Sequence, residues 1–245
     1  MAHVEHGLFD RGAARLAYEV RGEGPALLMI APGGMRSAMA AWSRLPFDLV
    51  GALAARFRVV LMDQRNAGAS MAPVHASDGW ATYTADQLAL MDHLGIERFA
   101  VAGMCIGGPY AIRLCRAAPE RVTRAVLFQP IGQDGENQAA FHALFDGWKD
   151  ERAANHPEAS DADWASFRAN LWDTGELLYG ASEDDVRATE QPLLVLVGDD
   201  LYHPRAVSER VVELAPDAEL VHDWKDPARG AALVARLHAF LAARD

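Results

Sequence analysis

One cysteine of this chain lies in a turn made of small residues. Positions 103–107 read GMCIG, with Cys105 at the centre. The apolar run before this turn predicts a buried strand, and the segment after it predicts a helix. A nucleophile on such a strained turn needs residues without bulky side chains two positions before and two positions after it. Gly103 and Gly107 meet that need, so the pattern predicts that Cys105 is a nucleophile.

The position of Cys105 at the start of a helix also has chemical consequences. Free N–H groups and the positive end of the helix dipole favour a thiolate and a developing oxyanion. The alternative interpretation is a small buried cysteine in a glycine-rich turn, since free cysteines are often structural. We interpret the second cysteine, Cys115, in that structural way.

Several other kinds of chemistry have no motif in the sequence. The chain lacks G-x-x-x-x-G-K-[ST], and it lacks G-x-G-x-x-G after the first expected parallel strand. It also lacks H-E-x-x-H and the Cys/His spacing of a metal site. The sequence therefore implies no nucleotide, nicotinamide or zinc cofactor.

Composition narrows the class of protein further. The 245 residues include 23 basic and 34 acidic residues, a formal net charge of −11. This balance argues against binding to nucleic acid or to an anionic membrane surface, which rests on Lys and Arg. Two cysteines outside any CxxC pair predict a reducing compartment. Residues 1–20 have no apolar h-region and no run approaches about 18 apolar residues, so we expect a soluble cytoplasmic protein.

Strands and helices are expected to alternate along the chain. Near-continuous apolar runs predict strands that are covered on both faces: residues 26–30, 57–62, 99–102, 125–128 and 193–197. An edge strand at 16–20, after a turn at 11–12, and a weaker strand at 219–222 complete this set. Helices are predicted from a capping box at Thr84 to Gly95, over 106–117, from Pro204 onward, and over 231–242. The alternation predicts an α/β fold with a doubly wound, mostly parallel sheet.

One region breaks this alternation. Residues 132–190 contain no strand-like run and predict a helical insertion, so residues 1–131 and 191–245 form the expected core domain. The insertion is rich in aromatic residues: Phe141, Phe145, Trp148, Trp164, Phe167 and Trp172. These side chains could simply pack against the core, but we favour a cap that acts as a lid over a pocket.

The chain resembles the α/β-hydrolase fold family over essentially its whole length. Residues 63–70 (DQRNAGAS) resemble the D-x-R-G-x-G-x-S loop after the family's fourth strand. Residues 198–204 (GDDLYHP) resemble the loop after the seventh strand that carries the catalytic acid. The cysteine turn is similar to those of dienelactone hydrolases and polyhydroxyalkanoate synthases, although most relatives place Ser there.

The resemblance implies an acid on the loop after the seventh strand. The family's acid usually stands four residues before the Pro of that loop, which points to Asp200, with Asp199 as the adjacent alternative. The family sometimes draws its acid from the loop after the sixth strand, where Asp134 and Glu136 lie.

For the base, the resemblance points to the region after the last strand. Relatives carry Gly-His there, and this chain has no such dipeptide. His222 occupies roughly that place and is our predicted base. If Asp223 takes the usual His position instead, His203 is the alternative base.

The oxyanion site departs from the family pattern too. The usual His-Gly after the third strand is replaced by residues 31–35, APGGM. Backbone N–H groups of Gly34 or Met35, paired with that of Ile106, are the predicted donors. Because these donors are backbone groups, changed side chains do not by themselves abolish the site.

Three functions follow from this pattern. The first is a cofactor-independent hydrolase of esters, lactones or thioesters that forms an acyl-cysteine through Cys105, His222 and Asp200. The second is an acyltransferase on the same scaffold, and the third is a non-hydrolytic, ligand-binding protein with an incomplete triad. The expected partner is a small-molecule substrate with an apolar acyl or ring portion, and a homodimer is among the arrangements left open.

Overall fold

Eight strands of the computed structural model, which describes residues 4–243, form one sheet in the order β1-β2-β4-β3-β5-β6-β7-β8. Strands from β4 to β8 along this order run parallel, whereas β1 and β2 pair antiparallel at one edge. The strands are β1 Val4–Arg11, β2 Ala14–Arg21, β3 Ala26–Ile30, β4 Arg58–Met62, β5 Phe99–Met104, β6 Val122–Phe128, β7 Leu193–Leu196 and β8 Ala218–Val221.

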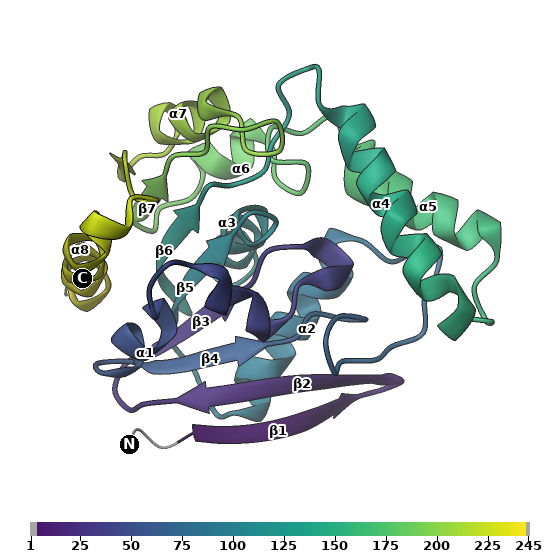
Figure 1. Ribbon diagram of the computed structural model, residues 1–245, viewed down its shortest axis with the longest axis horizontal. Helices are drawn as coiled ribbons and strands as arrows, with labels where there is room; N and C mark the ends of the chain where they lie inside the picture. Colours follow the sequence, from purple (N-terminus) through teal and green to yellow (C-terminus); the bar gives the residue numbers. More distant parts are fainter. Residues whose placement is uncertain (1–3, 244–245) are drawn as a thin grey trace.

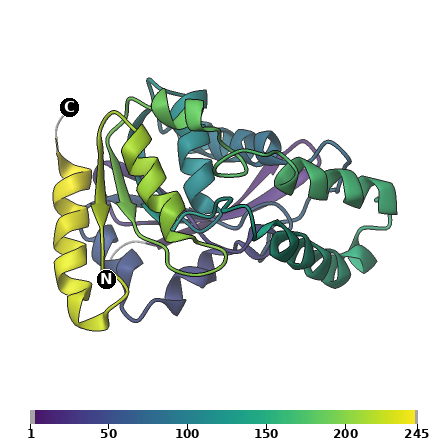
Figure 2. The ribbon, with the colours of Figure 1, turned by 90° about the horizontal axis from the view of Figure 1, so that it is seen from above.

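Helices cover both faces of this sheet (Figures 1 and 2). Helices α1 and α8 pack against one face, and α2 and α3 pack against the other. The α-helices are α1 Leu49–Ala54, α2 Trp80–His93, α3 Gly107–Ala117, α4 Gln138–Arg152, α5 Asp161–Trp172, α6 Glu183–Arg187, α7 Arg205–Leu214 and α8 Gly230–Ala242. Short 3₁₀ turns are η1 Gly34–Arg36, η2 Met39–Arg44, η3 Ala153–Asn155 and η4 Pro227–Arg229. The predicted α/β fold with a mostly parallel sheet is confirmed.

Helix α2 differs from the expected one at its start. It begins at Trp80, four residues before the expected capping box. Thr84 therefore lies inside the helix, where its hydroxyl donates to the Trp80 carbonyl at 2.8 Å. The predicted helix end holds, since Gly95 follows α2 with a φ of 64° that favours glycine.

The segment between β6 and β7 contains α4, η3, α5 and α6. Figures 1 and 2 show α4 and α5 side by side, on the opposite side of the molecule from α8. Helix α5 begins with a capping box between Ser160 and Asp163, and α6 with one between Ser182 and Asp185. These caps satisfy the first backbone N–H groups of each helix, so both helices have well-defined starts.

Within residues 4–243, no helix combines the length and the apolar character that crossing a membrane requires.

Candidate active site

Cys105 occupies the turn between β5 and α3. Its φ of 60° lies in the left-handed region, which costs a non-glycine residue on the order of 1–3 kcal/mol. A Cβ atom on Gly103 would lie 1.9 Å from the carbonyl oxygen of Gly107. A Cβ atom on Gly107 would lie 2.7 Å from the carbonyl oxygen of Ile30. The turn therefore requires the two glycines that the sequence pattern singled out.

Backbone hydrogen bonds hold Cys105 in this conformation. Its N–H donates to the Phe128 carbonyl at 3.0 Å. Its carbonyl accepts from the N–H groups of Gly108 at 3.0 Å and Ile131 at 3.2 Å. These bonds tie the turn to the end of β6 and to the first turn of α3, so the strain is offset by the surrounding structure.

Two backbone N–H groups face the sulfur of Cys105, those of Ile106 and Gly33, and both act to lower the pKa of the thiol. Ile106 is one of the predicted donors. The other N–H that faces the sulfur is that of Gly33, one residue before Gly34; Gly34 and Met35, the predicted oxyanion donors, lie in the same loop and stay a prediction. Gly33 has a φ of 115° and Gly34 a φ of 58°, both in the region that favours glycine, so the sequence carries no signal that separates the two.

Burial raises the pKa of the Cys105 thiol to about 12, because a thiolate would lose its hydration in this half-buried turn. The N–H groups of Ile106 and Gly33 oppose this effect without overcoming it, and the charge of Asp200 adds to it. The start of α3 acts in the expected direction through the Ile106 N–H, but burial outweighs it and the pKa of the thiol is raised. Attack by this sulfur needs a base.

An imidazole and a carboxylate are paired on the loop between β7 and α7. His203 Nδ1 lies 2.7 Å from Asp200 Oδ1. The same carboxylate oxygen accepts the backbone N–H groups of Tyr202 at 3.0 Å and His203 at 3.1 Å. Burial acts to raise the pKa of Asp200, but these hydrogen bonds prevail and the pKa is lowered. Asp200 is thus an ionised carboxylate that orients His203.

His203 is arranged as a proton acceptor. Burial lowers the pKa of its imidazole below 6.5, although Asp200 opposes the change, so the ring is neutral at pH 7. The Asp200 contact places the ring proton on Nδ1, which leaves Nε2 free to accept. Nε2 is buried and has no hydrogen-bond partner among residues 4–243.

His222 is not the imidazole that Asp200 holds, contrary to prediction. Its side chain is exposed, and its Nδ1 lies 3.4 Å from Nη1 of Arg205. The chain turns just after it at Asp223, with a φ of 52°, and the buried indole of Trp224 donates to the Val197 carbonyl at 2.9 Å. Because Trp224 anchors the loop after β8, His222 remains at the surface.

The other acids that were considered have local roles. Asp199 is exposed and pairs with Lys225. Asp134 Oδ1 accepts the backbone N–H groups of Glu136 and Asn137, at 2.9 and 3.0 Å, just before α4. Cys115 is fully buried in the core, as the structural interpretation predicted.

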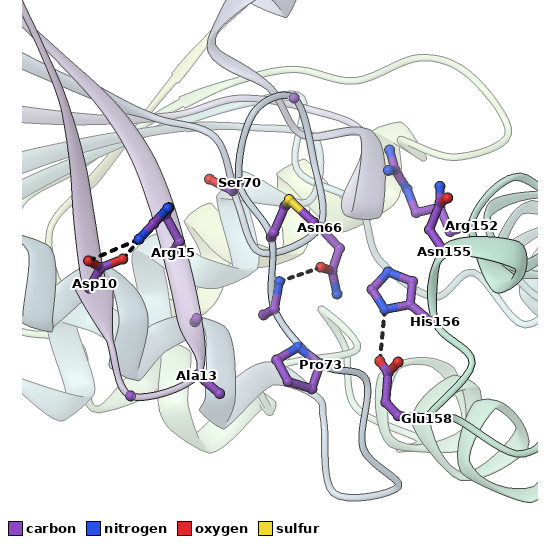
Figure 3. A pocket seen from close by; sticks show the side chains of 15 residues that line it. Asp10, Ala13, Arg15, Asn66, Ser70, Pro73, Arg152, Asn155, His156 and Glu158 are labelled. Atoms are coloured by element: carbon purple, nitrogen blue, oxygen red, sulfur yellow. Dashed lines mark hydrogen bonds and ion pairs between the residues drawn. The ribbon is translucent and has the colours of Figure 1, made fainter.

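A polar cavity of about 890 Å³ lies apart from this cysteine (Figure 3). It is bounded by the turn between β1 and β2, by residues 66–73 and by residues 152–158. Cys105, Asp200 and His203 are not among the residues that line it.

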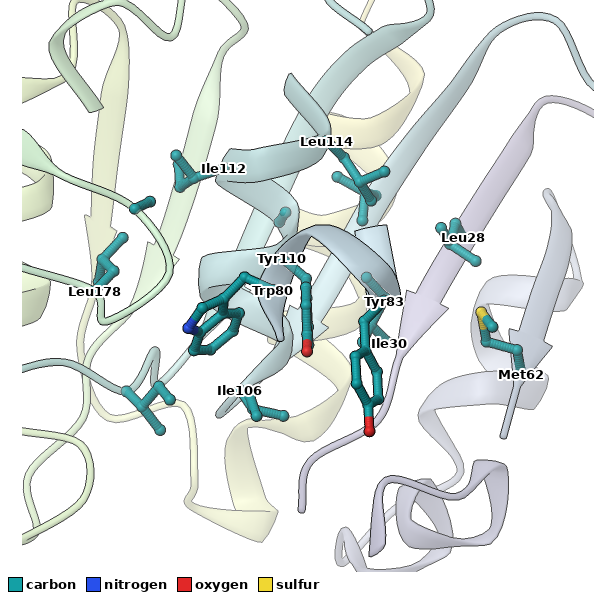
Figure 4. Packing of buried hydrophobic residues seen from close by; sticks show 14 of the residues in the cluster. Leu28, Ile30, Met62, Trp80, Tyr83, Ile106, Tyr110, Ile112, Leu114 and Leu178 are labelled. Atoms are coloured by element: carbon teal, nitrogen blue, oxygen red, sulfur yellow. The ribbon is translucent and has the colours of Figure 1, made fainter. Parts of the chain in front are cut away.

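The aromatic side chains of residues 132–190 are packed against the core. The Trp148 ring lies over the loop that carries Gly33, where a Cβ atom on Gly34 would be 2.0 Å from its Cη2. In α5, Trp172 makes an edge contact with Trp80 at 5.9 Å between ring centroids. Figure 4 shows Trp80, Tyr83 and Tyr110 gathered beside Ile106, the residue that follows Cys105 in the chain. The helical segment therefore contacts the loop that carries Gly33, called the donor loop below, and the part of the core beside the Cys105 turn.

The loop after β4 has a structural role. Asp63 accepts the backbone N–H groups of Met39 at 2.7 Å and Ala69 at 2.8 Å. Arg65 forms a two-pronged ion pair with the buried Asp86, at 2.7 and 3.0 Å. These bonds hold the loop in place beside the segment that follows η1. The loop therefore resembles the family's loop in the structure that it builds.

The fold, the cysteine turn and these loops define a known class of protein. The profile of the alpha/beta hydrolase fold family matches residues 27–193, and the chain belongs to that family. The carboxylesterase YbfK of Bacillus subtilis is 23% identical over 225 residues, covering 81% of this chain and 73% of that protein. The fluoroacetate dehalogenase of a Burkholderia species is 34% identical over 131 residues, covering 52% of this chain and 41% of that protein.

Solved structures agree on the fold. The crystal structure of the enol-lactonase from Burkholderia xenovorans LB400 superposes with a TM-score of 0.72 at 21% identity. The match covers 97% of this chain and 100% of the lactonase.

Proposed function

We propose that this chain is a cofactor-independent hydrolase that cleaves esters, lactones or thioesters through an acyl-cysteine on Cys105. The observation that carries the proposal is the strained position of Cys105, with the N–H groups of Ile106 and Gly33 facing its sulfur. This arrangement suits both a nucleophile and an oxyanion site. The carboxylesterase relative and the enol-lactonase with the same fold are in keeping with this class of substrate.

The base in this proposal is His203, oriented by Asp200. As the Cys105 sulfur attacks the carbonyl carbon, Nε2 of His203 takes the thiol proton. The oxyanion is received by the N–H groups of Gly33 and Ile106. The leaving group departs with the proton from His203, and a water activated by His203 then attacks the thioester, releasing the acid and restoring the thiol.

A cysteine nucleophile restricts the substrates. A thiolate leaves more readily than an alkoxide, so the tetrahedral intermediate from an alkyl ester tends to collapse backwards and expel Cys105. Good leaving groups, as in enol lactones, aryl esters and thioesters, favour the forward direction. Residues 132–190 would act as the lid over the acyl or ring portion, and Trp148 is the aromatic side chain placed over the donor loop. Both cysteines are free, which suits the cytoplasm.

Comparing leaving groups tests this mechanism. Hydrolysis of p-nitrophenyl butyrate should be far faster than hydrolysis of ethyl butyrate, and Cys105→Ala should abolish both activities. Equal efficiency with the two esters would contradict the cysteine mechanism. Products formed with added alcohol or thiol acceptors would separate an acyltransferase from a hydrolase.

One observation favours a second candidate, a non-hydrolytic protein that binds a ligand. The loop after β8, where the family usually carries its base, keeps His222 at the surface. In this alternative Cys105→Ala would leave ligand binding intact, and no acyl donor would be turned over by the unmodified protein.

A further inference from the structure

Asn66 is a buried residue in the wall of the cavity in Figure 3, and its amide nitrogen has no hydrogen-bond partner among the described residues. It stands where the resembled loop has glycine, and it adopts a φ of 62°, a left-handed conformation that asparagine tolerates better than most residues. Only 3% of the residue is exposed. Its Oδ1 accepts the Ala72 N–H at 2.8 Å, while its Nδ2 has no hydrogen-bond partner among the described residues. A buried donor left unpaired costs free energy unless something in the cavity accepts its hydrogen bond.

A second unpaired donor belongs to the same cavity. Arg152, the last residue of α4, lines the cavity, and its buried Nε has no hydrogen-bond partner among residues 4–243. Figure 3 shows Asn66 on the side of the cavity formed by the core, and Arg152 with His156 on the facing side. Both sides thus present donors without acceptors.

The carboxylates that line the cavity already have hydrogen-bond partners. Asp10 accepts from Arg15 Nε at 2.7 Å. Glu158 accepts from the Val74 N–H at 3.0 Å and lies 2.9 Å from His156 Nδ1. Arg152 forms no ion pair with any of residues 4–243, so its guanidinium is open to pair with the carboxylate of a ligand.

We propose that this cavity is a binding site for a small carboxylate, separate from the Cys105 site. The carboxylate would accept from Asn66 Nδ2 and from the Arg152 guanidinium. Ala13, Met71 and Pro73 offer apolar contacts to a short aliphatic or aromatic body. The volume of about 890 Å³ falls within the range of small-molecule sites.

Titration of the ¹⁵N-labelled protein with benzoate tests the proposal. The side-chain amide signal of Asn66, assigned by its absence from the Asn66→Asp spectrum, should shift as benzoate saturates the site. Arg152→Gln should weaken benzoate binding about tenfold or more, because a charge-assisted hydrogen bond is lost. Benzamide, the neutral analogue of nearly the same shape, should bind at least about tenfold more weakly than benzoate.

Arg15→Gln is the matched control, since Arg15 lines the same cavity but is already paired with Asp10. It should change benzoate affinity by no more than about threefold. Asn66→Asp keeps the acceptor for the Ala72 N–H, removes the donor and adds a negative charge, so it should abolish binding in a folded protein. An Asn66 signal that millimolar benzoate does not move, or equal binding of benzoate in Arg152→Gln, would overturn the proposal.

Discussion

At the scale of single residues, Cys105 combines a strained backbone with a protonated thiol. The left-handed φ holds its side chain on the turn between β5 and α3, where the N–H groups of Ile106 and Gly33 face the sulfur. Burial outweighs these two donors and raises the pKa of the thiol to about 12. The geometry thus places two N–H donors at the sulfur, while the reactivity of the sulfur depends on a base.

The pH dependence of alkylation should show this protonated thiol. Only the thiolate reacts with iodoacetamide, so the rate should rise about tenfold per pH unit from pH 7 to pH 10, without a plateau. Mass spectrometry of the peptide that contains Cys105 would measure this rate separately from that of the fully buried Cys115. A rate that levels off near pH 7 would mean that the thiolate is already formed in the resting protein.

The two histidines should differ sharply in their contribution to catalysis. His203→Ala should lower kcat for p-nitrophenyl esters by about a hundredfold or more, because the proton acceptor is removed. His222→Ala is the control on an exposed imidazole and should change kcat by no more than about twofold. A large loss of kcat in His222→Ala, together with an unchanged kcat in His203→Ala, would show that the base lies on the loop after β8.

A site residue could be predicted when the residues that determine its position lie close to it in the chain. The turn around Cys105 could be predicted because its pattern occupies five consecutive residues, although Gly107 is required by the Ile30 carbonyl on β3. Asp200 was named from its distance to Pro204 within a single loop. The base was harder, since whether His222 or His203 meets Asp200 depends on Trp224, which anchors a different loop to β7. Gly33 and Gly34 are the same residue type, so the sequence does not show which of their N–H groups points to the sulfur.

At the scale of elements, α4 is docked onto the loop that carries Gly33. Trp148 packs over Gly34, and Arg36 Nε donates to Glu151 Oε2 at 2.8 Å. A movement of this helix would therefore disturb the position of a donor that faces the sulfur. Helix α4 and the loop that carries Gly33 are coupled through direct contact.

Variants of two tryptophans in the helical segment can distinguish an effect on the donor loop from a general loss of packing. Trp148→Ala and Trp164→Ala each remove a buried indole and should each cost about 3–5 kcal/mol of the free energy of unfolding. Only Trp148→Ala should also lower kcat/KM by about tenfold or more, since Trp148 alone of the two lies on the donor loop. Urea unfolding and ester hydrolysis measured on both variants would check this; equal activity losses would contradict the coupling.

Elements with buried apolar runs were the predictable ones. The run at 26–30 became β3 with unchanged bounds, because a strand covered on both faces has few polar positions. Strand β1 was not predicted, since it lies at the sheet edge, its residues are largely exposed and it contains no apolar run. The start of α2 was placed too late because Gly79, which precedes the helix, has no side chain to mark a cap.

At the scale of the whole molecule, one buried carboxylate joins distant parts of the chain. Asp86 in α2 is fully buried and pairs with Arg65 after β4 and with Arg11 at the end of β1. It thereby ties the edge hairpin and the loop after β4 to the core. The two arginines compensate the buried charge of Asp86, and without Asp86 their own charges would lack a partner.

Removing this carboxylate should destabilise the whole domain. Asp86→Ala should cost about 3–5 kcal/mol of the free energy of unfolding, because two guanidinium groups lose their buried partner. Asp10→Ala breaks the exposed pair with Arg15 and should cost no more than about 1 kcal/mol. Urea denaturation of the two variants would measure the difference, and similar costs would show that the Asp86 pairs add little.

The central claim is that Cys105 forms an acyl-enzyme, and intact-protein mass spectrometry tests it most directly. The protein would be mixed briefly with p-nitrophenyl butyrate and quenched in acid, beside Cys105→Ala and Cys115→Ala. We expect one butyryl adduct on the unmodified protein and on Cys115→Ala, and none on Cys105→Ala. An adduct that persists in Cys105→Ala, or the absence of both adduct and turnover in the unmodified protein, would contradict a nucleophilic role for Cys105.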